Sequence, residues 1–150
     1  MNLLQSTDTA SGLEQLQSWI ASGHQPAIGE TMKFSLVEAS EGRAVFEAIP
    51  GAHAYNPIGA VHGGYAATLL DSACGCAVHS SLTHEQAYTT LELKVAYHRA
   101  LSTTTGPVRA EGKVVSMGKR VAFAEARITD NDGRLYASAT STLLVFERKP

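Results

Sequence analysis

A run of small and apolar residues between positions 63 and 80 constrains the fold of this 150-residue chain more than any other segment. Its apolar positions recur at helical spacing and include Ala66, Leu69, Leu70, Ala73, Cys76 and Ala77. A helix that lacks a broad polar face has to be covered on nearly all sides. The run therefore predicts a buried helix of about four turns that begins at Gly63 or Gly64.

The residues after this helix alternate between apolar and polar as strands do. Leu91, Leu93, Val95 and Tyr97 alternate with other residues at a period of two, which is typical of a half-buried strand. Further strands are predicted over 107–115, 120–129 and 135–146, with hairpin turns at 117–119 and 130–133. Two strands over 32–38 and 43–49, joined by a turn at 40–42, precede the helix. One apolar helix and a long antiparallel run predict an α+β fold, with a curved sheet wrapped around that helix.

Length and composition favour a single domain over residues 1–150, with residues 1–27 as a helical leader. In the leader, Ser11 and Glu14 have the spacing of a capping box, while residues 1–8 are polar and expected to fray. A net charge of −2 without a basic run indicates neither nucleic acid nor a membrane as partner. We expect no signal peptide or spanning helix, and the cysteine pair fits a reducing, cytoplasmic setting.

Asp71 is a carboxylate in the middle of the apolar helix. It belongs to a narrow stripe of polar and small residues at helical spacing, made of Thr68, Asp71, Ser72, Gly75 and His79. Such a stripe can face a cleft or a second helix. Two interpretations of Asp71 are open: a general base or nucleophile, or a structural carboxylate paired with Thr68 or Ser72 hydroxyls.

His62, Gly63 and Gly64 stand where the helix begins. Free N–H groups and the positive end of the helix dipole stabilise an oxyanion there, and glycines let a ligand carbonyl approach the backbone. The alternative is a tight turn that needs glycine only for steric reasons. Eight residues of helix span about 12 Å, so Gly63 and Asp71 of one chain cannot both touch one carbonyl. If both are catalytic, two subunits must share each site, and the sequence then predicts a dimer.

Three segments resemble the hotdog-fold acyl-CoA thioesterases of the phenylacetate-degradation (PaaI-like) type: residues 56–64, 69–73 and 90–95. The resemblance implies a homodimer, usually a dimer of dimers, that hydrolyses an acyl-CoA without metal or cofactor. It implies that the Gly63 amide holds the oxyanion and that Asn56 and His62 orient the thioester. Asp71 of the neighbouring subunit would activate water or attack directly. Thr90 would help to hold that water or the Asp71 carboxyl group.

The turn between the second and third strands after the helix is basic. Together with Gly64, its residues are the candidates for binding coenzyme A: Ser116, Gly118, Lys119 and Arg120. The alternative is a solvated hairpin. His98 and Arg99 are weaker candidates.

Cys74 and Cys76 point about 200° apart on a helix, so we expect buried packing residues and no metal site. Two other functions are kept as alternatives: a non-catalytic acyl-CoA sensor and a hotdog enoyl-CoA hydratase. The sequence leaves open whether the acyl group is an aryl group or a medium-length chain.

Overall fold

The computed structural model describes residues 9–149, so the expectation for residues 1–8 lies outside the described residues. Helices α1 (Gly12–Ser22) and α2 (Ala27–Met32) precede strands β1 (Phe34–Ser40) and β2 (Arg43–Ala48). A short 3-10 helix (Ala52–Ala54) leads to the long helix α3 (Gly63–His79). Strands β3 (Gln86–Tyr97), β4 (Val108–Met117), β5 (Val121–Asp130) and β6 (Leu135–Glu147) complete the described chain.

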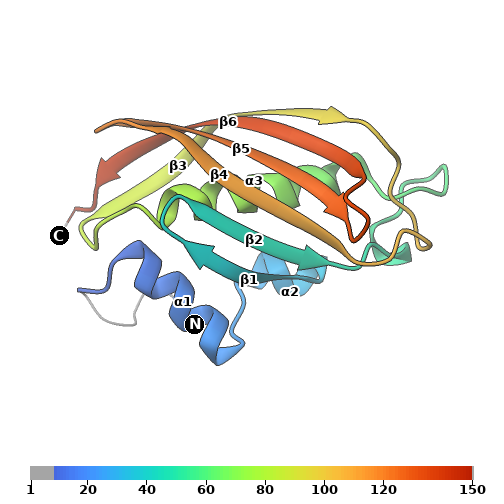
Figure 1. The fold of residues 1–150 in the computed structure, drawn as a ribbon, viewed down its shortest axis with the longest axis horizontal. Coiled ribbons are helices and arrows are strands. Elements are labelled where there is room, and N and C mark those ends of the chain that lie inside the picture. Colours follow the sequence, from blue (N-terminus) through green and yellow to red (C-terminus); the bar gives the residue numbers. More distant parts are fainter. Residues whose placement is uncertain (1–8, 150) are drawn as a thin grey trace.

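The strands of residues 9–149 form one six-stranded antiparallel sheet in the order β1-β2-β4-β5-β6-β3. The sheet curves over α3, which runs along its inner face, while α1 and α2 lie beside β1 (Figure 1). This is the hotdog fold, and it confirms the predicted α+β architecture. The strand order also leaves β3, a twelve-residue strand, at one edge of the sheet.

Helix α3 is covered by the sheet along most of its length, as its composition predicts. Leu69, Leu70 and Ala73 have no exposed surface. The helix backbone also comes very close to β4, because a Cβ atom added at Gly112 would lie 2.1 Å from the Ala73 carbonyl oxygen. Only a glycine at this position lets helix and strand approach so closely.

Helix α1 begins and ends as the sequence predicts. The Ser11 hydroxyl accepts from the Glu14 amide, and the Glu14 carboxylate accepts from the Ser11 amide at 2.8 Å. Gly23 ends the helix in the left-handed conformation, with φ of 69°. Leu16 points inward and is fully buried, so α1 is part of the core.

The prediction of a strand over 32–38 was wrong at its start. Residues 27–32 form α2, and β1 begins only at Phe34. Lys33 separates the two in a left-handed conformation, with φ of 58°. A six-residue helix is too short to show a helical period, and it is held by packing: a Cβ at Gly29 would lie 2.8 Å from the Phe34 carbonyl oxygen.

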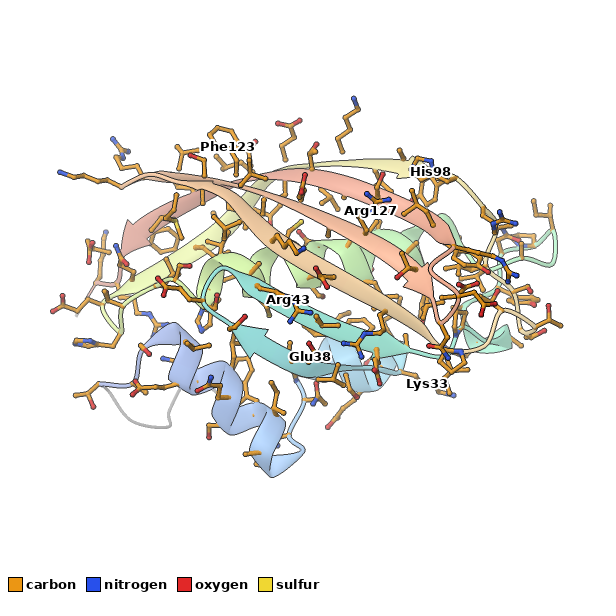
Figure 2. The ribbon with its side chains drawn as sticks, viewed as in Figure 1. Lys33, Glu38, Arg43, His98, Phe123 and Arg127 are labelled. Atoms are coloured by element: carbon orange, nitrogen blue, oxygen red, sulfur yellow. The ribbon has the colours of Figure 1, made fainter. Side chains whose placement is uncertain are left out.

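The outer face of the sheet is mixed in character. Along β5, Ala122, Ala124 and Ala126 are buried toward α3, while alternate side chains project outward. Phe123 and Arg127 are two of these outward side chains (Figure 2). No helix within residues 9–149 is both long enough and apolar enough to cross a membrane.

Candidate functional site

Asp71 is half-buried on α3 and has one hydrogen-bond donor from the sheet. The Thr90 hydroxyl of β3 donates to its Oδ1 at 2.9 Å. Thr68, which sequence reasoning offered as a structural partner, donates instead to the Gly64 carbonyl oxygen at 2.7 Å. Within the described residues the second carboxylate oxygen, Oδ2, accepts no hydrogen bond from a side chain. Asp71 therefore keeps a free carboxylate oxygen on a partly open face of the helix.

The start of α3 is arranged by His62, which is its N-cap. The Nδ1 atom of His62 accepts from the Gly64 amide at 2.8 Å, so its proton is on Nε2 when the ring is neutral. The Tyr97 hydroxyl donates to the Gly63 carbonyl oxygen at 2.7 Å. The Gly63 amide donates to no group among residues 9–149. Of the two glycine amides, Gly63 is thus the one available to an incoming oxygen.

Asn56 lies on a small hairpin that leads into this helix start. Its side-chain oxygen accepts from the Ile58 and Ala60 amides, both at 3.1 Å, and a bridge between Tyr55 and Val61 closes the hairpin. The oxygen of the side-chain amide is therefore used to shape the loop. Its NH₂ group has no acceptor within the described residues, which leaves it able to donate to a carbonyl.

The structure brings the candidate residues together in groups and keeps those groups apart. Asn56, His62, Gly63 and Gly64 gather at the start of α3, and Asp71 pairs with Thr90 two turns further along. Gly63 and Asp71 are about 12 Å apart along the helix axis, as the rise per residue requires. The chain by itself does not place the Gly63 amide and the Asp71 carboxylate around one atom.

The polar stripe of α3 is only partly open. Thr68, Asp71 and Ser72 are half-buried, whereas Gly75 and His79 are covered within the chain. The side chain of Tyr88 covers Gly75, and α1 covers His79. The stripe is therefore partly exposed over Thr68, Asp71 and Ser72 and covered at its far end, which single-sequence spacing does not reveal.

Sequence reasoning missed two tyrosines of β3 that shape the site. Tyr97 holds the start of α3, and Tyr88 lies against Gly75 with its hydroxyl 2.7 Å from the position of an added Cβ. A signal was present for Tyr88, since it precedes Thr90 by two residues and so shares its face of the strand.

The basic turn lies at the other end of the sheet from Gly63. The turn connects β4 to β5, and Val121 at the start of β5 pairs with Leu144 of β6. Leu144 in turn pairs with Thr89, near the start of β3, so the turn lies at that end of the sheet. Gly63 lies beside Tyr97, at the end of β3 (Figure 1). A cavity of about 320 Å³ at the Gly63 end is lined by His62, His98, Arg99 and Tyr136 among others. His98 projects at this end of the molecule (Figure 2).

The two cysteines do not act as a pair. Cys74 is buried and Cys76 is half-buried, and neither is disulfide-bonded. Burial, reinforced by the negative charge of Asp71, raises the pKa of each thiol to about 12. Both are protonated at neutral pH and are poor nucleophiles.

Comparisons with known proteins place these elements among the thioesterases. A family model described as the thioesterase superfamily matches residues 58–137. A 1,4-dihydroxy-2-naphthoyl-CoA hydrolase of Listeria monocytogenes serotype 1/2a (strain 10403S) is 27% identical over 120 residues, which cover 80% of this chain and 96% of that protein. The family match spans every candidate site residue except Asn56.

Two solved structures share the fold. A thioesterase family protein from Silicibacter pomeroyi is 25% identical with a TM-score of 0.76, covering 89% of this chain and 96% of that chain. A Streptococcus mutans UA159 protein, solved with acetyl-CoA bound, is 23% identical with a TM-score of 0.69. The latter match covers 78% of this chain and 91% of that chain.

Proposed function

The chain belongs to the thioesterase superfamily and is a thioester hydrolase that acts on acyl-CoA, and we propose that two subunits share each of its reaction centres. The Gly63 amide of one subunit binds the thioester oxygen, and Asp71 of the partner subunit supplies the reacting carboxylate. The observation that carries this proposal is the distance between the Gly63 amide and the Asp71 carboxylate, which are about 12 Å apart along one helix. One chain offers a free helix-start amide and a free carboxylate oxygen but cannot join them.

The free edge of β3 supports a dimer in which this sharing occurs. An edge strand of twelve residues presents a row of unpaired backbone groups, which a second β3 can satisfy by antiparallel pairing. The half-buried stripe of Thr68, Asp71 and Ser72 lies on the side of α3 next to this edge, as the Thr90 contact indicates. Two-fold pairing across β3 sets the helices side by side and in opposite directions.

The chemistry follows from the two groups. Negative charge develops on the thioester oxygen as the carbonyl carbon is attacked, and a fixed N–H donor stabilises that charge by about 2.7–4 kcal/mol. Asp71 either takes a proton from water, which then attacks, or attacks the carbonyl carbon directly and forms an anhydride that water opens. In both routes the C–S bond breaks, the thiolate of coenzyme A receives a proton, and the acid is released.

The proposed coenzyme A contacts fit the same arrangement. In a two-fold dimer paired along β3, the β4–β5 turn of the partner lies at the same end of the joined sheet as Gly63. Lys119 and Arg120 of that turn are exposed and free to meet phosphates, with Ser116 and Gly118 beside them. Gly64 lies at the mouth of the helix-start site.

The acyl group is proposed to be an aryl group or a medium-length chain. The Listeria relative is named for an aromatic substrate, a dihydroxynaphthoyl-CoA, which favours the aryl class. We further propose that the enzyme is of the PaaI-like type, because the Asn56, His62–Gly63–Gly64 and Asp71 pattern is kept in full.

Replacing Asp71 tests this function directly. Asp71→Asn keeps the size of the side chain and its contact with Thr90 but lacks the basic oxygen. We expect kcat to fall by at least about 10²–10⁴-fold, the usual contribution of a general base, while substrate still binds. Thiol release from benzoyl-, phenylacetyl- and octanoyl-CoA measures turnover, and calorimetry measures binding.

Asp132→Asn is the matched control, because Asp132 is an exposed carboxylate in the β5–β6 turn. It should keep wild-type kcat. Wild-type turnover by Asp71→Asn would contradict the role of Asp71, and the absence of turnover by the wild-type protein on any acyl-CoA would contradict the function itself.

A further inference from the structure

Tyr88 of β3 lies beside the Asp71 site, and the chemistry described above does not use it. It stands two residues before Thr90, so both side chains are on the face of the sheet that α3 covers. The Thr90 hydroxyl contacts Asp71, and the Tyr88 hydroxyl reaches Gly75, one helical turn further along. A Cβ atom at position 75 would lie 2.7 Å from the Tyr88 oxygen, so the glycine lets this hydroxyl rest against the helix.

The ring of Tyr88 separates Asp71 from an aromatic cavity at the far end of α3. This cavity has a volume of about 610 Å³, and neither Asp71 nor Thr90 lines it. Its walls include Trp19, Cys76, His79, Tyr88 and Phe146. The Tyr88 ring meets the His79 ring at 5.9 Å, with 61° between the planes, and this contact helps to hold it in place. Tyr88 therefore closes the Asp71 site at this end.

The hydroxyl of Tyr88 is unpaired within residues 9–149 but remains open to water. In this part of the chain the Tyr65 hydroxyl is the side-chain polar atom that is both enclosed and unpaired. The Tyr88 hydroxyl is not enclosed in this way, so water can reach its oxygen. Burial, and then Cys76 and Asp71, raise the pKa of Tyr88 above its ordinary value. The hydroxyl therefore keeps its proton at neutral pH, and its oxygen can accept a hydrogen bond.

The free oxygen of Asp71 and the Tyr88 hydroxyl lie about one helical turn apart. Asp71 and Gly75 are separated by about 6 Å along the axis, and the Tyr88 hydroxyl lies over Gly75. No hydrogen bond joins Tyr88 to Asp71 directly in the described chain. One water that bonds to two oxygens bridges about 5–6 Å, because each bond is about 2.7–2.8 Å long. Thr90 holds Oδ1 of Asp71, which leaves Oδ2 for such a water.

We propose that Tyr88 positions the attacking water, which donates one hydrogen bond to Asp71 Oδ2 and the other to the Tyr88 hydroxyl oxygen. The inference rests on the proposed function and selects one of its two routes, in which Asp71 acts as a base and does not attack the substrate. With both of its protons held, the water directs a lone pair toward the thioester carbon that the Gly63 amide of the other subunit presents.

The reaction then balances without any further reagent. Asp71 Oδ2 takes one proton while the water oxygen bonds to the carbonyl carbon, and the carbonyl electron pair moves to the oxygen held by the Gly63 amide. That pair returns as the C–S bond breaks, and the sulfur leaves with the electrons of that bond. The sulfur receives its proton from Asp71, and the second water proton stays on the released acid. Tyr88 keeps its own proton throughout, so it is a positioning residue.

Tyr88→Phe removes the hydroxyl and keeps the ring. The substrate is whichever of benzoyl-, phenylacetyl- and octanoyl-CoA the wild-type protein hydrolyses fastest. We expect kcat to fall by about tenfold. Affinity for the substrate, measured by calorimetry in the Asp71→Asn background, should change by less than about twofold, because the water and not the substrate loses a contact. A role in packing alone would weaken binding or lower the unfolding midpoint while sparing kcat.

Thr89→Val is the matched control. It also removes a hydroxyl from β3, next to Tyr88, but the Thr89 side chain is exposed on the other face of the strand. This variant should keep the wild-type kcat. An unchanged kcat in Tyr88→Phe, or an equal loss in Thr89→Val, would overturn the inference.

The coupling between Tyr88 and Asp71 tests whether they hold the same water. Adding Tyr88→Phe to Asp71→Asn should lower the residual kcat by less than about twofold, because the base that this water serves is already gone. A full tenfold loss in both backgrounds would mean that the two residues act independently, and the inference would be wrong.

Turnover in water labelled with ¹⁸O tests the route in the wild-type protein, and it decides even if Tyr88→Phe does not fold. When water attacks the thioester carbon, the label enters the released acid and Asp71 stays unlabelled after many turnovers. Label on Asp71, read by mass spectrometry of its peptide, would show that Asp71 attacks the substrate. That result would overturn the inference while the proposed function stands, whereas failure of the wild-type protein to hydrolyse any acyl-CoA would count against the function instead.

Discussion

At the scale of single residues, hydrogen bonds hold the groups next to each proposed reacting atom. His62 accepts from the Gly64 amide, while the Gly63 amide has no acceptor among residues 9–149. Thr90 holds one oxygen of Asp71, so the other stays available. Tyr97 donates to the Gly63 carbonyl oxygen and thereby holds the peptide between Gly63 and Gly64 at the start of α3. These contacts orient the groups before substrate arrives, which lowers the cost of stabilising the transition state.

Replacing Gly63 by proline tests the oxyanion role of its amide. Proline is well accepted at the first position of a helix, and His62 already has the extended conformation that a residue before proline requires, with φ of −61° and ψ of 137°. Gly63→Pro therefore removes the N–H while keeping the helix. We expect kcat to fall by about 10²–10³-fold.

Gly63→Ala is the matched control for that substitution. Both variants add a Cβ that would lie 3.0 Å from the Tyr97 hydroxyl, but alanine keeps the N–H. The alanine variant should therefore lose far less activity than the proline variant. Equal losses in the two variants would show that the added carbon, and not the missing proton, is responsible.

The buried His79 predicts a dependence of stability on pH. Burial, followed by Arg148, lowers its pKa from 6.5 to about 4 in the folded chain, while the unfolded chain keeps the ordinary value. Between these pH values the unfolded state binds more protons, so stability falls as pH drops from about 6.5 to 4. The loss amounts to about 3 kcal/mol.

Urea unfolding of the wild-type protein and of His79→Gln across this pH range measures that contribution. Glutamine can still donate to Gln15 but does not titrate, so its curve should be flatter between pH 6.5 and 4. Identical curves would mean that other groups cause the acid sensitivity.

At the scale of elements, the position of the site depends on how closely α3 approaches the sheet. The helix backbone rests on β4 at Gly112, and the side chains of Tyr88 and Thr90 reach α3 from β3. Helix α1 then closes the far end through Leu16 and the Gln15–His79 contact. The proposed reacting groups are therefore placed by packed elements, whereas Asn56 lies on a loop and the proposed coenzyme A contacts lie at the β4–β5 turn.

Gly112→Ala tests the contact between helix and sheet. The new Cβ would lie 2.1 Å from the Ala73 carbonyl oxygen and 2.9 Å from the Cys74 amide nitrogen, both backbone atoms of a packed helix. We expect the free energy of unfolding to fall by about 3 kcal/mol or more, because neither backbone can shift without disturbing the packing around it. Thermal unfolding should show it as a midpoint lower by roughly 6–12 °C.

Thr140→Ala, at an exposed position of β6, is the control and should change stability by less than about 0.5 kcal/mol. An unchanged midpoint for Gly112→Ala would show that α3 can move away from β4 without loss.

Sequence patterns predicted the long elements well and the short ones poorly. Helix α3 and the hairpin turns after β1, β4 and β5 have strong signals, namely a small-residue run and glycine-containing turns at Gly42, Gly118 and Gly133. Helix α2 has none, because six residues contain less than two turns. Strand β3 begins at Gln86, five residues before the clean alternation, because pairing with β6 extends it.

At the scale of the whole molecule, the proposed reaction centre requires a second copy of the chain. No strand of residues 9–149 covers the outer edge of β3, and the Gly63 amide and the Asp71 carboxylate are too far apart to act on one atom within one chain. A dimer paired along β3 would cover this edge and would bring the amide of one subunit near the carboxylate of the other.

Mixing two inactive variants tests this sharing. Co-expressed Asp71→Asn and Gly63→Pro chains form hybrid dimers in which one site combines an intact amide with an intact carboxylate. We expect roughly a quarter of the wild-type activity to return, since half of the dimers are hybrids with one working site each. Each variant expressed alone serves as the control. No recovery in purified hybrids would mean that each site lies within one subunit.

The sequence by itself determined the central helix, the strands that wrap it and the two residues, at the start and middle of the helix, that we propose as reacting groups. These features are local, because periodicity, glycine pairs and a carboxylate in an apolar run can be read without knowing what packs against them. Only the tertiary structure decided that Thr90 and not Thr68 holds Asp71, that the Gly63 amide is the free one, and that His79 ends an aromatic cavity. Those facts depend on contacts between residues far apart in the chain, and no spacing rule within one segment contains them.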